Sequence, residues 1–233
     1  LPKHLPLVRC VPPEGTQRMG EFVCWAVLSL NKDARRMAIA QAKSTWDAFD
    51  PPFAAAAKTV GIMGLGAMGL RAAAMLRGLG IPVVGWSRTR KDVDGIDCFA
   101  GPAELPAFLA RSEVLVCLLP ATPETVGLIA APLLAQLPKG AGLVQVGRGA
   151  HQVLPDIIAA LDSGQLSGAM LDVFAKEPLP ADSPAWSHPR ITVTPHAASL
   201  PSRLERARYI ADCIARLERG EALPNLYVPE RGY

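Results

Sequence analysis

The sequence lacks the features of a membrane-spanning, disulfide-rich or nucleic-acid-binding protein. No apolar run approaches the roughly 18 residues of a transmembrane helix, because the longest uncharged stretch, 125–138, is interrupted by Pro132 and Gln136. The five cysteines are an odd number, lie far apart and form no CxxC pair. This usage favours reduced thiols in a cytosolic protein over disulfides or a metal site. The net charge is only +3, so we expect neither a nucleic acid nor a membrane surface as a partner.

Apolar and turn-forming residues are abundant instead. Half of the 233 residues are hydrophobic and 19% are charged, which excludes a disordered chain and allows a sizeable core. At roughly 150 residues per domain, the length corresponds to about one and a half domains. The opening residues, LPKHLPLVR, lack the apolar core of a signal peptide and contain no initiator Met, so we expect the true start to lie upstream.

A long helix is predicted after this Pro-rich, irregular opening. From about Gln17, apolar residues recur at the three- and four-residue spacing of one helical face: Met19, Phe22, Val23, Ala26, Val27 and Leu30. We expect one helix over 17–45. Asp50-Pro51-Pro52 then ends the pattern, and a short Ala-rich linker leads to Lys58.

From Thr59 onward, short apolar runs alternate with helical stretches. The expected strands are 59–63, 82–86, 113–119, 142–146, 168–173 and 191–195. The expected helices are 67–79, 104–110, 131–137, 151–163 and 201–219. Strands that are apolar on both faces and alternate with helices indicate an α/β fold with a doubly wound parallel sheet. Ligands of such sheets bind outside the carboxyl ends of the strands.

A G-x-G-x-x-G motif follows the first expected strand and opens the next helix. Its glycines are Gly64, Gly66 and Gly69, in the string VGIMGLGAMG. This context predicts a dinucleotide site, in which the glycines allow a tight turn, close approach to a pyrophosphate and close packing of helix on strand. The alternative is a Gly-rich turn that binds no ligand.

The end of the second expected strand favours NADP over NAD. An NAD site places an acidic residue there to bind the ribose 2′-hydroxyl. This chain has Ser87-Arg88-Thr89-Arg90-Lys91 instead, and Arg88 can pair with a 2′-phosphate bidentately. The alternative is a solvated basic loop.

Three residues with the chemistry of a 2-oxoacid reductase fall just beyond consecutive strand ends. They are Arg148, Glu177 and His196. Such a reaction needs a cation for the substrate, an acid to protonate the developing alkoxide, and a carboxylate to hold the imidazolium. Singly, each residue has an ordinary structural explanation, but together beside a nucleotide fold they predict catalysis. We expect His151 to be a polar first-turn residue and find no sequence partner for His4 or His188.

These motifs resemble the D-isomer-specific 2-hydroxyacid dehydrogenases, and among them the A-type glyoxylate/hydroxypyruvate reductases. The matching strings cover most of residues 58–233: WSRTRK, FAG, LLPATPETVGLI, LPKGAGLVQVGRGAH, ALDSGQLSGAMLDVFAKEPLP, HPRITVTPHAA and RGY. The resemblance implies His196 as acid/base, Glu177 as its carboxylate partner, Arg148 as substrate anchor and NADPH as reductant. It implies small 2-oxoacids as substrates, with no metal. The implied cofactor contacts are Gly64, Gly66, Ala67, Met68, Gly69, Ser87, Arg88, Thr89, Arg90, Leu119, Pro120, Thr125, Val146, Gly147, Asp172 and Ala198.

The resemblance also implies how the chain is divided. Family members begin with a flavodoxin-like substrate lobe, of which we expect residues 1–16 to be the end. We expect a Rossmann domain over 17–199, with a dimerisation arm at 17–50, and a helix and tail over 200–233 that return to the lobe. Something on the order of 100 residues, a small domain, is then missing, which leaves the apolar face of the last helix exposed.

Trp46 is the one arm residue with an implied functional role. Related reductases form homodimers, and in them a Trp near this point reaches into the substrate pocket of the partner subunit. Packing in the core is the alternative for this side chain.

Two other functions compete with a 2-oxoacid reductase. GIMGLGAMG also resembles the β-hydroxyacid dehydrogenases, but these carry a large helical domain with a catalytic Lys after the nucleotide fold. A nucleotide-binding interaction module without turnover is the other alternative, because some members of the superfamily are corepressors. Such a module has no physical need for Arg148, Glu177 and His196 together.

Overall fold

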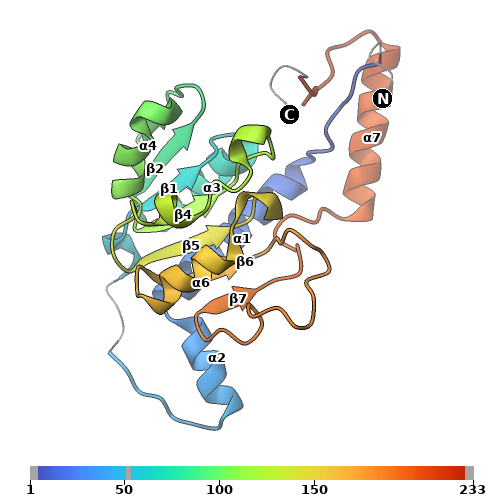
Figure 1. Ribbon diagram of the computed structural model, residues 1–233. Helices are drawn as coiled ribbons and strands as arrows, with labels where there is room; N and C mark the ends of the chain where they lie inside the picture. The colour runs from blue at the N-terminus through green and yellow to red at the C-terminus, as the bar shows by residue number, and fades with distance from the viewer. Residues whose placement is uncertain (1–4, 51–53, 229–233) are drawn as a thin grey trace.

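The computed structural model describes residues 5–50 and 54–228, and a seven-stranded sheet forms its centre (Figure 1). The strands are β1 (Val60–Met63), β2 (Val83–Ser87), β3 (Asp97–Ala100), β4 (Val114–Cys117), β5 (Ala141–Gln145), β6 (Leu166–Leu171) and β7 (Ile191–Val193). Neighbouring strands are all parallel, in the order β3-β2-β1-β4-β5-β6-β7. Every residue of β1, β4 and β5 is buried, as expected for strands that are apolar on both faces. The predicted doubly wound parallel sheet is confirmed.

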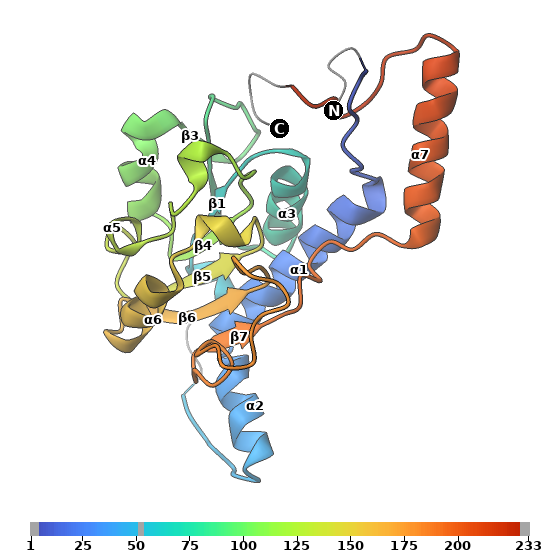
Figure 2. The same cartoon turned by 45° about the vertical axis from the view of Figure 1, so that its right-hand side comes forward.

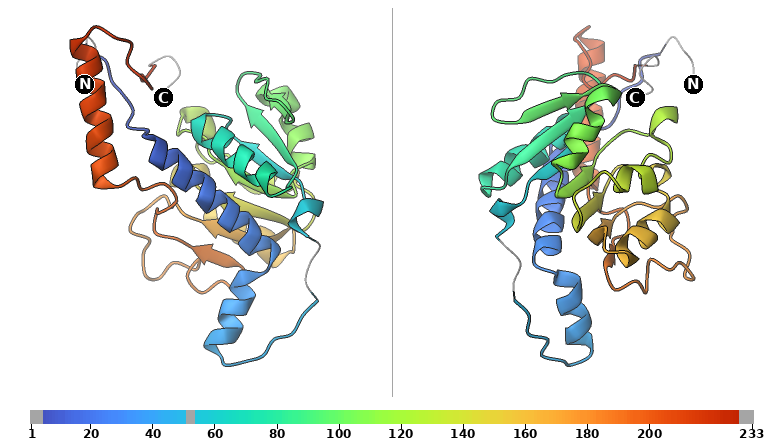
Figure 3. Two further views of the ribbon diagram at one scale, coloured as in Figure 1. Left: turned by 180° about the vertical axis from the view of Figure 1, so that it is seen from behind. Right: turned by 60° about the vertical axis from the view of Figure 1, so that its left-hand side comes forward.

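Helices cover both faces of this sheet (Figure 3). They are α1 (Pro13–Asn31), α2 (Ala34–Ala42), α3 (Ala67–Gly78), α4 (Gly101–Ala110), α5 (Ala131–Leu134), α6 (Leu154–Asp162) and α7 (Arg203–Glu218). On one face α1 packs beside α3, and Val23, Val27 and Leu76 contribute to the core there. On the other face lie α4, α5 and α6, with Phe108 and Leu161 in a second core.

The predicted helix over 17–45 is wrong, because two helices occupy this region. The apolar stripe from Met19 to Val27 is buried against the sheet as expected. After α1 the chain turns at Asp33, which has a left-handed φ of 52°, and α2 buries no residue. Of the arm expected over 17–50, α2 and residues 43–50 project from the body (Figures 1 and 2), whereas α1 packs on the sheet beside α3.

Other boundaries also differ from expectation. The edge strand β3 was not predicted, because its residues are exposed or half-buried and so give no apolar run. The helix expected from His151 begins at Leu154 instead, since Gly149–His151 form a separate 3-10 turn.

The last helix, α7, stands clear of the sheet (Figures 1 and 2). None of its residues is buried, and Leu204, Ile214 and Leu217 are each more than half exposed. Its first turn is anchored to α1, because the backbone N–H and hydroxyl of Ser202 both donate to Glu14 at 3.0 Å. The apolar face of the helix is thus exposed, as the sequence predicts.

The described ranges contain no helix that is long and apolar enough to cross a membrane. They also contain no group of three His, Cys, Asp or Glu side chains placed to hold a metal ion. All five cysteines lie in these ranges, and each is a free thiol.

Candidate active site

A glycine cradle lies at the carboxyl end of β1, where the strand order reverses between β1 and β4. Gly64 has a φ of 114°, which favours glycine, and Gly69 packs so tightly on the Gly64 carbonyl that a Cβ would clash. At Gly66 a Cβ would meet nothing within 4 Å, so the backbone there is open to a ligand. The helix α3 begins at the next residue without a side-chain cap, and its first N–H groups lack intrahelical partners. This cradle fits the pyrophosphate of a dinucleotide.

The loops after β4 and β5 close around the cradle. A Cβ on Gly64 would lie 3.0 Å from the Leu118 carbonyl carbon, so the loop with Leu119 and Pro120 adjoins it directly. In this loop the Thr125 hydroxyl donates to the Pro120 carbonyl at 2.9 Å. Val146 and Gly147 follow β5 and are buried beside the same loop. The structure therefore brings these five predicted cofactor residues into the two loops beside the glycines, although their contact with a cofactor stays a prediction.

The basic loop after β2 contains cations in different settings. Ser87 is buried, and its hydroxyl donates to the Thr89 carbonyl at 2.7 Å. The Arg90 guanidinium donates to the Cys98 carbonyl at 2.9 Å and forms an ion pair with Glu104. Hydrogen bonds from Thr122 and its own backbone, assisted by the charge of Arg88, lower the pKa of Glu124. Two acidic side chains from other segments, Glu104 and Glu124, thus lie near the cations of this loop. The sequence of the loop, which contains no acid, does not predict them.

The three predicted reacting residues meet at the carboxyl ends of β5, β6 and β7. His196 Nδ1 lies 2.7 Å from Glu177 Oε2, and the Phe174 N–H donates to Glu177 Oε1 at 2.9 Å. Burial raises the pKa of Glu177, but the hydrogen bonds from His196 and Phe174 and the charges of His196 and Arg148 outweigh it and leave that pKa lowered. Arg148 is exposed in the turn after β5. This arrangement offers a cation, a carboxylate and an imidazole whose Nε2 is turned away from the carboxylate.

Asp172 shapes the loop that carries His196. Its buried carboxylate accepts hydrogen bonds from the Thr194 hydroxyl at 2.6 Å and from the N–H groups of Ala197 and Ala198 at 2.8 and 3.0 Å. The Asp172 carbonyl accepts from the His196 N–H at 2.9 Å. Asp172 and Ala198, predicted as cofactor contacts, therefore help to hold the loop that carries His196.

Three other expectations about single residues need correction. His151 is not a polar first-turn residue, since it is fully buried beneath the Arg148 turn. His188 does have partners, because its Nε2 lies 3.3 Å from Asp162 and its Nδ1 accepts from the Arg190 N–H at 3.1 Å. Core packing of Trp46 is wrong, because the side chain is 95% exposed on the projecting arm. His4 lies outside the described residues.

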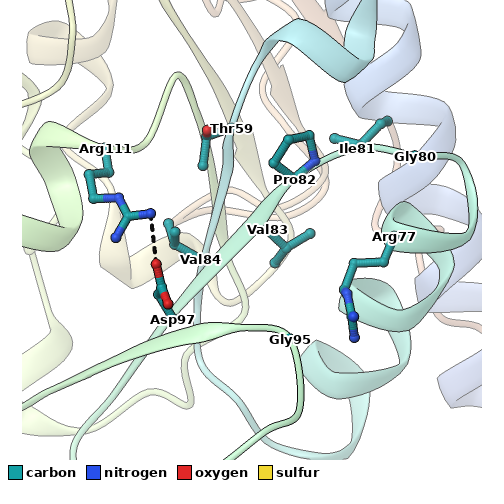
Figure 4. Close-up of a pocket in the computed structure, with 10 residues that line it drawn as sticks. All are labelled: Thr59, Arg77, Gly80, Ile81, Pro82, Val83, Val84, Gly95, Asp97 and Arg111. Atoms are coloured by element: carbon teal, nitrogen blue, oxygen red, sulfur yellow. Dashed lines mark ion pairs between the residues drawn. The ribbon is translucent and has the colours of Figure 1, made fainter.

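A cavity of about 480 Å³ lies at the opposite edge of the sheet (Figure 4). Thr59 and Pro82 line it, and they precede β1 and β2. Its cations are engaged, since Arg111 pairs with Asp97 at 2.8 Å and Arg77 donates to the Asp94 carbonyl at 2.8 Å. The three predicted reacting residues, Arg148, Glu177 and His196, do not line this cavity.

Comparison with known proteins gives consistent matches. A family model described as "D-isomer specific 2-hydroxyacid dehydrogenase, NAD binding domain" matches residues 24–198. A D-isomer-specific 2-hydroxyacid dehydrogenase from Xanthobacter autotrophicus Py2, in complex with NADPH and MES, is 43% identical, with a TM-score of 0.92 over 99% of this chain and 95% of that chain. A probable 2-hydroxyacid dehydrogenase from Rhizobium etli CFN 42, in complex with NADP, HEPES and L(+)-tartaric acid, is 39% identical, with a TM-score of 0.94 over 100% of this chain and 74% of that chain. An NADPH-dependent glyoxylate/hydroxypyruvate reductase from Sinorhizobium meliloti, in complex with NADP and sulfate, is 39% identical, with a TM-score of 0.92 and the same coverage.

Proposed function

The chain belongs to the D-isomer-specific 2-hydroxyacid dehydrogenase family of oxidoreductases, and from its site we propose that it reduces small 2-oxoacids with NADPH. The substrates are glyoxylate, reduced to glycolate, and hydroxypyruvate, reduced to glycerate. The observation that carries the proposal is the 2.7 Å contact between His196 Nδ1 and Glu177, beside Arg148 and the glycine cradle. The relative from Sinorhizobium meliloti, described as a glyoxylate/hydroxypyruvate reductase, supports the choice of substrate.

Each residue of the site has a distinct task in this reaction. Arg148 binds the carboxylate of the 2-oxoacid, because a guanidinium forms paired hydrogen bonds with a carboxylate. Glu177 accepts a hydrogen bond from the Nδ1–H of His196, which orients the imidazolium so that its Nε2 proton faces the substrate. His196 then donates that proton to the keto oxygen as the carbonyl carbon is reduced. Bound NADPH supplies the hydride.

The cofactor would be held by the residues that meet at the switch point of the sheet. The N–H groups at the start of α3 would bind the pyrophosphate, and Gly66 leaves room for it. Arg88 is the residue we assign to the 2′-phosphate, because it directly follows β2, where an NAD site has an acidic residue, and its guanidinium can bind a phosphate through paired hydrogen bonds.

Arg88→Ala should raise the KM for NADPH by about 10- to 100-fold, the effect of losing one or two charge-assisted hydrogen bonds. The KM for NADH, which has no 2′-phosphate, should change far less. Steady-state assays with both cofactors measure the ratio. Arg111→Ala is the matched control, because it removes a cation that pairs with Asp97 at 2.8 Å at the opposite end of the strands, and it should leave that ratio nearly unchanged. An equal effect of Arg88→Ala on both cofactors would show that the 2′-phosphate is not bound there.

The direct test of the proposed function is NADPH oxidation by the 233-residue chain with glyoxylate and with hydroxypyruvate, followed by absorbance, with NADH in parallel. Turnover that prefers NADPH supports the proposal. NADPH binding without turnover of either substrate would contradict it for this chain and favour a binding module.

We also propose that the chain acts as a homodimer through the arm formed by α2 and residues 43–50. On this arm α2 buries no residue and Trp46 is 95% exposed, which is unusual for so large an apolar side chain. Trp46→Ala should raise the dimer dissociation constant about tenfold or more, the effect of losing an aromatic anchor.

Sedimentation velocity over a range of protein concentrations measures this change. Leu79→Ala is the control, because Leu79 is 52% exposed at the end of α3, away from the arm. A chain that is monomeric at every concentration, or a dimer that Trp46→Ala leaves unchanged, contradicts the proposal.

A further inference from the structure

Two buried polar side chains hold the turn that carries Arg148. Gln145, the last residue of β5, accepts a hydrogen bond from the Gly147 N–H at 3.1 Å and donates one to the Arg148 carbonyl at 3.1 Å. His151 Nδ1 accepts a hydrogen bond from the Arg148 N–H at 3.2 Å. Neither side chain is exposed to solvent. Side chains thus bind both the N–H and the carbonyl of Arg148.

His151 also joins this turn to the neighbouring loop. Its Nε2 lies 3.2 Å from the Pro120 carbonyl, in the loop that follows β4. A neutral imidazole has one donor and one acceptor nitrogen. Because Nδ1 accepts a hydrogen bond from the Arg148 N–H, Nε2 carries the proton and donates a hydrogen bond to the Pro120 carbonyl. One tautomer therefore satisfies both contacts.

The surroundings keep this imidazole neutral. Burial lowers the pKa of His151, and the charge of Arg148 lowers it further against the opposing effect of the Pro120 carbonyl. Cys117 Sγ lies 3.7 Å from Nδ1, and burial raises the pKa of Cys117 to about 12, so its thiol stays protonated. A Cβ on Gly147 would lie 2.8 Å from Nδ1, so glycine is needed for this close approach.

The position of the Arg148 guanidinium depends on the turn. Its Nη1 donates to the carbonyl of Gly147 at 2.6 Å, which belongs to the same turn. A shift of the turn therefore moves both the backbone and the charged group of Arg148.

We propose that His151 is a positioning residue, which fixes the Arg148 turn against the Pro120 loop so that the guanidinium is held where a 2-oxoacid carboxylate binds. This inference rests on the proposed function, because it takes Arg148 as the substrate anchor. The alternative is that His151 only packs in the core and does not position Arg148.

Three substitutions separate the two possibilities. His151→Leu removes both polar contacts, His151→Asn keeps an acceptor close to the position of Nδ1, and His151→Gln keeps a donor near Nε2. His151→Leu should raise the KM for glyoxylate about tenfold through the lost hydrogen bond, with kcat and the KM for NADPH changed less than about twofold. His151→Asn should restore most of the wild-type KM, whereas His151→Gln should not.

A residue that only packs the core would act differently. Its loss would lower the thermal midpoint and the active fraction, and so kcat, without raising the substrate KM. The control for this effect is Gln165→Leu, which removes half-buried hydrogen bonds to Leu134 and Leu137 away from the site. It should lower stability and leave the KM for glyoxylate unchanged.

NMR spectra of the whole chain supply a measurement that does not depend on turnover. The imidazole nitrogen spectrum should show His151 as the neutral Nε2–H tautomer. Hydrogen exchange at the Arg148 amide should be at least about tenfold faster in His151→Leu and near wild type in His151→Asn. If His151→Leu does not fold, His151→Gln, with the donor kept, should still show the raised KM and the faster exchange.

The possible failures can be told apart. A wild-type chain that reduces no 2-oxoacid overturns the proposed function, while the exchange of the Arg148 amide still decides whether His151 holds the turn. An active enzyme in which His151→Leu leaves the substrate KM or the Arg148 exchange unchanged overturns the positioning role. Failure of His151→Asn to restore the KM does so as well.

Discussion

His196→Gln and His196→Ala should lower kcat for 2-oxoacid reduction by about 10²- to 10⁴-fold, the usual contribution of a positioned general acid. The Kd for NADPH should stay within about twofold, because the imidazole lies at the ends of β6 and β7 and the glycine cradle follows β1. Stopped-flow absorbance measures the first quantity, and quenching of protein fluorescence by NADPH measures the second.

The chain offers a matched control for this result. His188 also contacts a carboxylate, because its Nε2 lies 3.3 Å from Asp162 at the end of α6. His188 precedes β7 and so lies at the amino ends of the strands, opposite the site. His188→Gln removes another histidine that contacts a carboxylate and should leave kcat within about twofold. Comparable losses in both variants would mean that the defect is structural, and full activity of His196→Gln would remove His196 from the reaction.

The parallel sheet and the common location of Arg148, Glu177 and His196 are predictable because each rests on a local pattern. Strands such as β4 and β5 are apolar on both faces, and their carboxyl ends necessarily meet at one edge of the sheet. Arg148, Glu177 and His196 are far apart in sequence, yet each follows such a strand. The strand order thus brings them together without any contact being predicted.

The elements that were mispredicted lack a pattern of this kind. The edge strand β3 has no fully buried residue, so its sequence, DCFA, resembles a loop. The break after α1 depends on the left-handed conformation of Asp33, whereas Arg35 and Arg36 continue a helix-compatible composition. Trp46 is exposed in this chain, and its sequence neighbours give no reason for that.

One residue that supports the Arg148 turn, Gln145, could have been identified from the sequence. Gln145 is a polar residue in the otherwise apolar run GLVQV, and a buried amide needs hydrogen-bond partners. The nearest unsatisfied backbone groups are those of the Gly-Arg-Gly turn that follows. His151 could not be placed in the same way, because the 3-10 turn at 149–151 folds it back under the turn instead of opening a helix.

Glu177→Gln should lower kcat about 10²-fold or more and change the pH dependence of what remains. A carboxylate within hydrogen-bond distance favours the protonated form of an imidazole. Contacts with His196 and Phe174 lower the pKa of Glu177, so wild-type activity should decline at acid pH as that carboxyl is protonated, and this acid decline should be absent from the variant. In the wild-type chain the Phe174 N–H donates to Glu177 Oε1 at 2.9 Å. The amide oxygen of the variant can accept the same hydrogen bond, so the fold of the loop should persist. The pH profile of kcat/KM for glyoxylate measures this change on the acid side.

The control for Glu177→Gln is Asp162→Asn, which neutralises the carboxylate beside His188 and should move neither kcat nor the pH profile. The same carboxylate also affects the stability of the folded state at acid pH. Folding lowers the pKa of Glu177, so its ionised carboxylate favours the folded state above its ordinary pKa, and this contribution is lost as the pH falls through the lowered value. The acid side of the stability curve should therefore flatten in Glu177→Gln, together with the acid side of the activity curve. A loss of activity with the wild-type pH profile would show that Glu177 shapes the loop without acting on the charge of His196.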